Sequence, residues 1–143
     1  MNDQPKVYIA GVGMITPIGA DAAMTAAAVR AGICGYKYSD FALESHERVR
    51  MALVPEQVLE TSLNATIKIR RLNARQIRLL QLATVALEQL QPQLPPNIKL
   101  PLFIAGSEPM DNEEQAINTA WLDNLSKQTE VNFDVPQIGR AHV

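Results

Sequence analysis

The stretch VYIAGVGMITPIGAD, residues 7–21, decides the fold class. It opens with three residues that favour strands, and residues 6–13 are apolar on both faces, which is typical of a central strand covered on both sides. Residues 16–19 have the composition of a turn, and Asp21 is a good N-cap for a helix. We therefore expect a buried strand, a turn and a helix, in that order.

The helix after Asp21 is expected to cover residues 22–31 and to stop at Gly32. Its surface is almost entirely small, because alanine occupies positions 22, 23, 26, 27, 28 and 31. A helix with so small a surface can lie very close to a sheet or to another helix. We expect this helix to be buried.

The middle of the chain is predicted to be mainly helical. Residues 35–54 mix aromatic and charged side chains, and we expect irregular structure with short strands there. Pro55 fits the first position of a helix over about residues 56–63. Asn73 can cap a longer helix over residues 74–90, whose apolar residues recur at helical spacing. One side of that longer helix therefore belongs to the core.

Basic residues surround the start of the longer helix. Arg75 and Arg78 lie in its first turns, where the helix dipole disfavours cations, so we infer that they pair with a carboxylate or a carbonyl elsewhere. The segment Lys-Ile-Arg-Arg at residues 68–71 is also basic. We interpret this segment as a solvated face, because the formal net charge of the chain is only -2.

A second buried strand, LPLFIAG, is predicted at residues 100–106, after a proline-rich loop at residues 91–100. A last helix is expected to begin at Asp111 or Asn112, with Glu113 and Glu114 in its first turn, Lys127 in its last turn, and an apolar stripe of Ile117, Trp121 and Leu125. Two buried strands joined through helices imply a parallel pair with a right-handed crossover. A parallel sheet needs further strands at its edges and helices on both faces, so we expect part of the fold to be absent.

Composition places the chain among globular proteins. Its 143 residues are 47% hydrophobic and 20% charged, which argues against a mostly disordered chain. The small net charge gives no electrostatic reason to expect a nucleic acid or an anionic membrane as partner. No apolar run approaches the roughly 20 residues of a membrane span, and Gly11, Gly13 and Pro17 would break the core of a secretory signal. The expected location is the cytoplasm.

A dinucleotide site must be considered at Gly11-Val12-Gly13, which follows a predicted strand and precedes a helix. The fingerprint requires a third glycine or alanine three places on, whereas position 16 is threonine and Pro17 follows. The helix then begins too late for its N-terminus to reach a phosphate held by these glycines. We expect no cofactor here.

The remaining reactive side chains do not form a site. Cys34 is the one cysteine, so no internal disulfide is possible, and a small buried hydrophobe is its commonest role. His46 and His142 lack paired acids or cysteines at ligand spacing, so no metal site is expected. Ser107 and Glu108 follow the second strand without a positioned histidine, which is typical of a turn into a helix. We assign no catalytic, substrate-binding or metal-ligating residue.

The opening of the chain resembles that of the β-ketoacyl synthases. Those chains begin with a strand, then Gly-x-Gly, a Val-Thr-Pro-x-Gly turn and a helix ending in Ala-Gly-x-Ser-Gly. The positions that match in order and spacing are Gly11, Gly13, Thr16, Pro17, Gly19, Ala31, Gly32 and Gly35. Cys34 stands where the family has serine, and Ser107-Glu108-Pro109 stands where it has a glycine-rich turn. The later stretches RQIRLLQLATVALEQL and LPLFIAGS resemble the next long helix and strand, so the match extends to about Asp134.

The resemblance implies a thiolase-like fold with two related α/β halves, a homodimer, and acyl carrier protein as partner. Such enzymes acylate a cysteine from a carrier-protein thioester and condense it with the carbanion formed by decarboxylation of malonyl-carrier protein. Two histidines assist the decarboxylation and stabilise the thioester oxyanion. In the family this cysteine and both histidines lie beyond the portion seen here, so none is carried onto this chain. The pathway, fatty acid or polyketide, stays open.

The last six residues, Ile-Gly-Arg-Ala-His-Val at 138–143, are what the bases ATC GGA AGA GCA CAC GTC encode. That string looks like a common sequencing-library adapter. We therefore expect residues 138–143 to be a non-native tail, and we exclude His142 from any site.

Together these inferences predict that residues 1–137 form the truncated N-terminal region of a β-ketoacyl synthase. The expected class is α/β, an incomplete N-terminal half of a thiolase-like fold with a parallel or mixed sheet and flanking helices. The full-length enzyme would be an acyltransferase, whereas this chain would be inactive. One alternative is a non-catalytic, synthase-like dimerisation scaffold, and a weaker one is a nucleotide-binding α/β domain.

Overall fold

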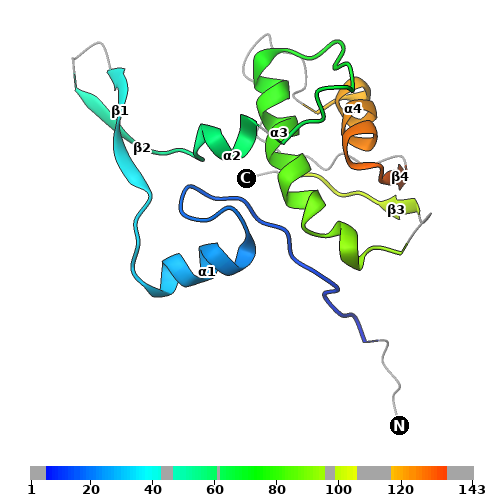
Figure 1. Ribbon diagram of the computed structural model, residues 1–143, viewed down its shortest axis with the longest axis horizontal. Helices are drawn as coiled ribbons and strands as arrows, with labels where there is room; N and C mark the ends of the chain where they lie inside the picture. Colours follow the sequence, from blue (N-terminus) through cyan, green and yellow to red (C-terminus); the bar gives the residue numbers. More distant parts are fainter. Residues whose placement is uncertain (1–5, 43–46, 61, 96–98, 106–116, 135–143) are drawn as a thin grey trace.

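The computed structural model describes residues 6–42, 47–60, 62–95, 99–105 and 117–134 (Figure 1). These residues form helices and two separate two-stranded sheets, so the chain mixes α and β structure. In chain order the elements are α1 (Ala22–Arg30), β1 (Tyr36–Ala42), β2 (Arg48–Ala52), α2 (Glu56–Glu60), α3 (Ala74–Glu88), a 3-10 turn at Gln91–Gln93, β3 (Lys99–Pro101), α4 (Thr119–Thr129) and β4 (Asn132–Asp134).

The core lies between α3 and α4, which run side by side (Figure 1). Leu80 from α3 and Trp121 and Leu125 from α4 are buried in contact with one another. The indole N–H of Trp121 donates to the backbone carbonyl of Gln76 at 3.0 Å, so its polar atom is satisfied inside the core. The apolar residues predicted at helical spacing therefore do form the core faces of both helices.

Helix α3 begins as the sequence predicts. The Asn73 side chain accepts from the backbone N–H of Gln76 at 2.8 Å, and the Gln76 side chain accepts from the N–H of Asn73 at 3.0 Å, which makes a reciprocal capping box. Arg78 forms an ion pair with Glu56 of α2 at 2.7 Å and donates to the carbonyl of Val54 at 3.3 Å. The inferred carboxylate and carbonyl partners are thus confirmed for Arg78.

The short strands expected in residues 35–54 form one antiparallel hairpin, β1–β2, in which Tyr36 pairs with Ala52 and Tyr38 with Arg50. The hairpin extends away from α3 and α4 (Figure 1). The guanidinium of Arg50 lies 5.5 Å from the centre of the Tyr38 ring, within the range of a cation–π interaction.

The predicted buried strand at residues 6–13 is wrong. These residues form no strand, and the side chains of Val7 and Ile9 are 95% and 86% exposed. The segment instead lies against α3, where Gly13 contacts the Ala86 carbonyl and the Gln89 side chain exchanges two hydrogen bonds, each 3.0 Å long, with the backbone of Met14. A strand needs a neighbouring strand for its backbone hydrogen bonds, and the described residues supply none here.

The predicted pairing of the two buried strands is wrong for the same reason. The observed parallel pair joins β3 to β4, with Leu100 opposite Phe133. Strand β3 covers only Lys99–Pro101, and Phe103 beyond it is 79% exposed. The strand predicted at residues 100–106 is therefore much shorter than expected, and residue 106 lies outside the described residues.

Helix α1 has the predicted ends but not the predicted burial. The Asp21 side chain accepts from the N–H of Met24 at 2.7 Å, and Gly32, at a φ of +69°, follows the last turn. Only Thr25 and Ala28 of this helix are buried, because no described sheet or helix covers its other alanines. Cys34 is likewise exposed, so its expected burial is wrong.

Helix α4 begins at Thr119 with Asn118 as its N-cap, and not at Asp111 or Asn112. The Asn118 side chain accepts from the N–H of Trp121 at 2.9 Å, which defines this start. The two predicted starting residues, together with Glu113 and Glu114, lie outside the described residues. Lys127 does occupy the last turn, as predicted.

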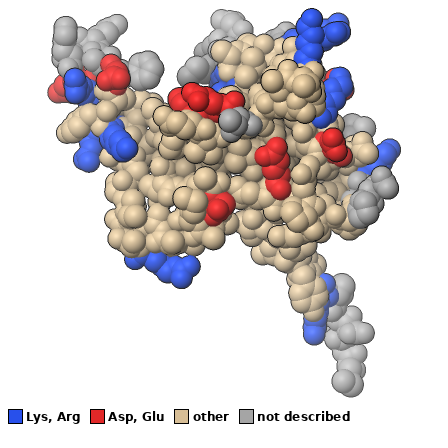
Figure 2. All heavy atoms as spheres, in the orientation of Figure 1, with Lys and Arg blue, Asp and Glu red and all other residues tan. Residues whose placement is uncertain are grey.

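Several large apolar side chains of the described residues are exposed to solvent, among them Val7, Tyr8, Ile9 and Phe103. In the face shown in Figure 2, Lys and Arg side chains lie towards the edges, whereas several Asp and Glu side chains lie nearer the middle. The described residues therefore leave part of their apolar surface uncovered.

Candidate functional site

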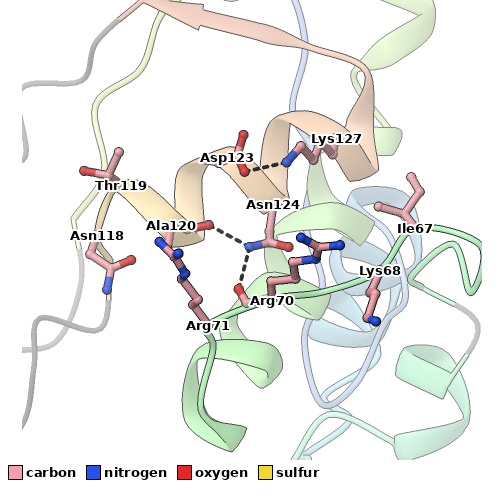
Figure 3. Close-up of a pocket in the computed structure, with 10 residues that line it drawn as sticks. All are labelled: Ile67, Lys68, Arg70, Arg71, Asn118, Thr119, Ala120, Asp123, Asn124 and Lys127. Atoms are coloured by element: carbon pink, nitrogen blue, oxygen red, sulfur yellow. Dashed lines mark hydrogen bonds and ion pairs between the residues drawn. The ribbon is translucent and has the colours of Figure 1, made fainter.

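A groove with a volume of 890 Å³ lies between α4 and the loop that precedes α3 (Figure 3). The loop contributes Ile67, Lys68, Arg70 and Arg71, and the start and one side of α4 contribute Asn118, Thr119, Ala120, Asp123, Asn124 and Lys127. Four of these side chains are cationic and one is a carboxylate. The groove therefore has a positive electrostatic potential.

Two buried amide side chains hold the loop against α4. The Asn124 amide donates to the carbonyl of Arg70 at 3.2 Å and to that of Ala120, in its own helix, at 2.7 Å (Figure 3). One turn further along, the Gln128 side chain accepts from the backbone N–H of Asn64 at 2.8 Å. Both ends of the loop are thus fixed to the same helix, so the groove is formed by the fold itself.

The arginines enter the groove from a strained part of the loop. Arg71 has a φ of +59°, in the left-handed region that costs a residue with a side chain about 1 kcal/mol or more. This conformation changes the direction of the chain immediately before the cap of α3 at Asn73. Strain of this size persists only where the surrounding contacts hold it, and here the bond from Asn124 to the neighbouring Arg70 carbonyl does so.

The cations of the groove differ in their partners. Lys127 forms an ion pair with Asp123, one turn earlier in α4, at 2.6 Å. Lys68, Arg70 and Arg71 are exposed and make no ion pair with any described residue. The groove can therefore bind an anion, but the side chains that line it include neither a nucleophilic cysteine or serine nor a histidine that could act as a base.

The reactive residues weighed from the sequence do not meet here. Cys34 follows α1 and is exposed, far along the chain from the groove. Gly11 and Gly13 face Gln93 and Ala86, so they pack against protein and do not form a phosphate cradle. His46, Ser107, Glu108 and His142 lie outside the described residues.

The described part of the chain contains no candidate metal site and no candidate membrane span. No group of three or more histidine, cysteine, aspartate or glutamate residues there could hold a metal ion. None of the described helices is both long enough and apolar enough to cross a bilayer.

The sequence indicated part of this site. Residues 68–71 were interpreted as a solvated basic face, and the exposure of Lys68, Arg70 and Arg71 confirms that they are solvated. The sequence does not indicate that these residues and α4 line one groove. Lys127 lies far along the chain from them, and the helix dipole already accounts for its position in the last turn. Asn124 carries no pattern in the sequence that would mark it as the link between the two segments.

Comparisons with protein-family models, with curated proteins and with solved structures gave no match to this chain.

Proposed function

We propose that residues 1–137 are the N-terminal region of a β-ketoacyl synthase, an enzyme that condenses acyl and malonyl thioesters carried on acyl carrier protein. The observation that carries this proposal is the ordered set of matches from Gly11 to Gly35, at the spacing of the family. In this proposal the full-length enzyme is a homodimer of thiolase-like fold. The cysteine nucleophile and the two histidines belong to the polypeptide that follows residue 137.

The geometry of the opening segment supports the proposal. Thr16 and Gly19 exchange backbone hydrogen bonds of 2.9 and 3.3 Å, so the Thr-Pro-Ile-Gly sequence forms a tight turn at the place where the family has one. The apolar segment before this turn exposes Val7, Tyr8 and Ile9 to solvent, and none of the described strands lies beside it. An apolar, strand-forming segment without a partner is what remains when a central strand is separated from its sheet.

The groove residues are consistent with a chain that binds and does not catalyse by itself. Cys34 is exposed and does not line the groove, whose polar side chains are cations, amides, one threonine hydroxyl and one paired carboxylate. We therefore infer that the isolated chain has no acyltransferase activity.

Sequencing the gene beyond codon 137 tests the proposal directly. The expected result is an open reading frame that encodes a cysteine at a strand-to-helix turn shortly downstream, followed by two histidines. The protein expressed from that frame should condense an acyl thioester with malonyl-carrier protein, whereas the 143-residue chain should not. A native frame that reads Ile-Gly-Arg-Ala-His-Val and then stops would contradict the proposal.

The alternative of a non-catalytic dimerisation scaffold requires a core that closes without further polypeptide. The described residues bury only Ala28, Leu59, Leu80, Trp121, Leu125 and Val131 among their apolar side chains. Since so few buried residues do not close a core of this chain length, the synthase proposal is favoured over the scaffold.

A further inference from the structure

The groove between α4 and the loop before α3 carries more positive charge than the described residues neutralise. Lys68, Arg70 and Arg71 approach it from the loop and have no acidic partner among the described residues. Lys127 lines the groove from α4, and its ion-pair partner among the described residues is Asp123. Like charges that line one groove repel one another, so an anion that enters the groove relieves the repulsion.

The start of α4 adds donors of a second kind. Thr119 and Ala120 line the groove and occupy the first two positions of the helix, where backbone N–H groups have no partner within the helix. The Asn118 side chain satisfies the N–H of Trp121, the next residue. The two remaining N–H groups and the positive end of the helix dipole therefore lie at the end of the groove that Arg71 lines, with Lys127 at the other end of α4 (Figure 3). Such an arrangement is suited to phosphate oxygens.

The size and rigidity of the groove favour a small ligand over a macromolecule. A volume of 890 Å³ lies within the range of roughly 300–1,000 Å³ typical of small-molecule sites. The loop is fixed to α4 at both ends by Asn124 and Gln128, so little ordering is needed when a ligand binds. Arginine side chains bind phosphate through two parallel hydrogen bonds, which adds geometric selectivity.

We propose that this groove binds a small molecule that carries two or more phosphate groups. Arg71, together with the N–H groups of Thr119 and Ala120 at the start of α4, binds one phosphate. Arg70 and Lys127, towards the other end of the helix, bind another (Figure 3). The bound anion competes with Asp123 for the Lys127 ammonium, so it loosens the ion pair within α4. This proposal stands on the groove alone and holds whether or not the chain belongs to a synthase.

Titration of the 143-residue chain with inorganic pyrophosphate tests the proposal. Trp121 is the one tryptophan of the chain, and it is buried. Because the neighbouring residue Ala120 lines the groove, the fluorescence of Trp121 reports both the packing of α4 and the binding of a ligand. We expect saturable binding by calorimetry, with a matching change in Trp121 fluorescence. We also expect much weaker binding of sulfate at equal ionic strength, because one anionic group cannot reach both sets of donors.

A pair of double variants with equal charge change provides the control. The variant Arg70→Gln with Arg71→Gln removes two groove cations, and we expect it to bind pyrophosphate at least about tenfold more weakly. The variant Arg30→Gln with Arg48→Gln removes two exposed cations elsewhere and should bind as the original chain does. Both variants should retain the emission of a buried Trp121.

Three results would overturn the proposal. The first is the absence of saturable pyrophosphate binding in the original chain, and the second is an equal weakening of pyrophosphate binding in both double variants. The third is stronger binding of a poly-glutamate peptide than of pyrophosphate, which would identify the groove as a protein-docking surface. Failure of this test leaves the gene-sequencing result unaffected, so the two proposals are separately testable.

Discussion

Gly13 lies so close to α3 that a Cβ atom at this position would overlap the carbonyl oxygen of Ala86. The obstructing atom belongs to the backbone of the last turn of α3, so it moves aside less easily than the end of a side chain would. The absence of a side chain at position 13 therefore allows the N-terminal segment to approach α3.

Replacement of Gly13 by alanine should detach this segment from α3. We expect a cost of about 1–3 kcal/mol, the range for an added methyl group in a tight contact. Hydrogen exchange of the Met14 N–H, which donates to the Gln89 side chain at 3.0 Å, measures the loss. Gly11→Ala serves as the control, because its new methyl group meets the end of the Gln93 side chain, which can rotate away. Equal exchange rates in the two variants would contradict this account.

Truncation of Trp121 should disrupt the packing of α3 against α4. We expect Trp121→Ala to destabilise this pair of helices by about 3–5 kcal/mol, since a large buried side chain is lost. Trp121→Phe keeps most of the apolar contact and loses the hydrogen bond to the Gln76 carbonyl, so about 1 kcal/mol is expected. Thermal unfolding of the original chain and the two variants, followed by the circular dichroism of their helices, ranks their stabilities. A phenylalanine variant as unstable as the alanine variant would show that the indole N–H dominates.

The ion pair between Arg78 and Glu56 should contribute little to stability. The side chains are 32% and 67% exposed, so solvent screens their attraction, and we expect a coupling energy of about 0.2–1 kcal/mol. A double-mutant cycle with Arg78→Met and Glu56→Gln measures it, at low and at high salt. We expect the coupling to decrease at high salt. A coupling above about 2 kcal/mol that is insensitive to salt would contradict this prediction.

The isolated chain should be poorly soluble and should not unfold in a sharp transition. Val7 and Ile9 expose apolar, β-branched side chains on a segment with free backbone donors and acceptors, which favours pairing between chains. The double variant Val7→Lys with Ile9→Lys should increase solubility, because it adds charge to this segment and leaves the contacts of Leu80 and Trp121 intact. Light scattering with circular dichroism checks both effects. A sharp, cooperative melt of the unmodified chain would instead support the scaffold alternative.

Local features of the fold were predictable from the sequence where the interactions that produce them are local. The caps at Asp21 and Asn73 and the turn at residues 16–19 depend on residues three or four positions apart, and all three were confirmed. The apolar spacing along α3 and α4 also placed Leu80, Trp121 and Leu125 in the core.

Features that depend on distant segments were not predictable. Residues 6–13 have the composition of a buried strand, but composition does not supply the neighbouring strand. The burial expected for α1 fails for the same reason, since its alanines need a surface to pack against. In the groove, the basic loop was visible in the sequence, whereas the position of Lys127 opposite it depends on two amide contacts that no pattern marks.

The Gln89 side chain occupies backbone hydrogen-bonding groups of the N-terminal segment that a neighbouring strand would otherwise bind. Its amide accepts from the N–H of Met14 and donates to the carbonyls of Met14 and Ala20, so one side chain imitates the peptide group of an adjacent strand. Because the substitute is a rotatable side chain and not backbone, an incoming strand can take over these bonds while α3 keeps its own hydrogen-bond ladder. The segment can therefore exchange its neighbour by rotation about the bonds of one glutamine.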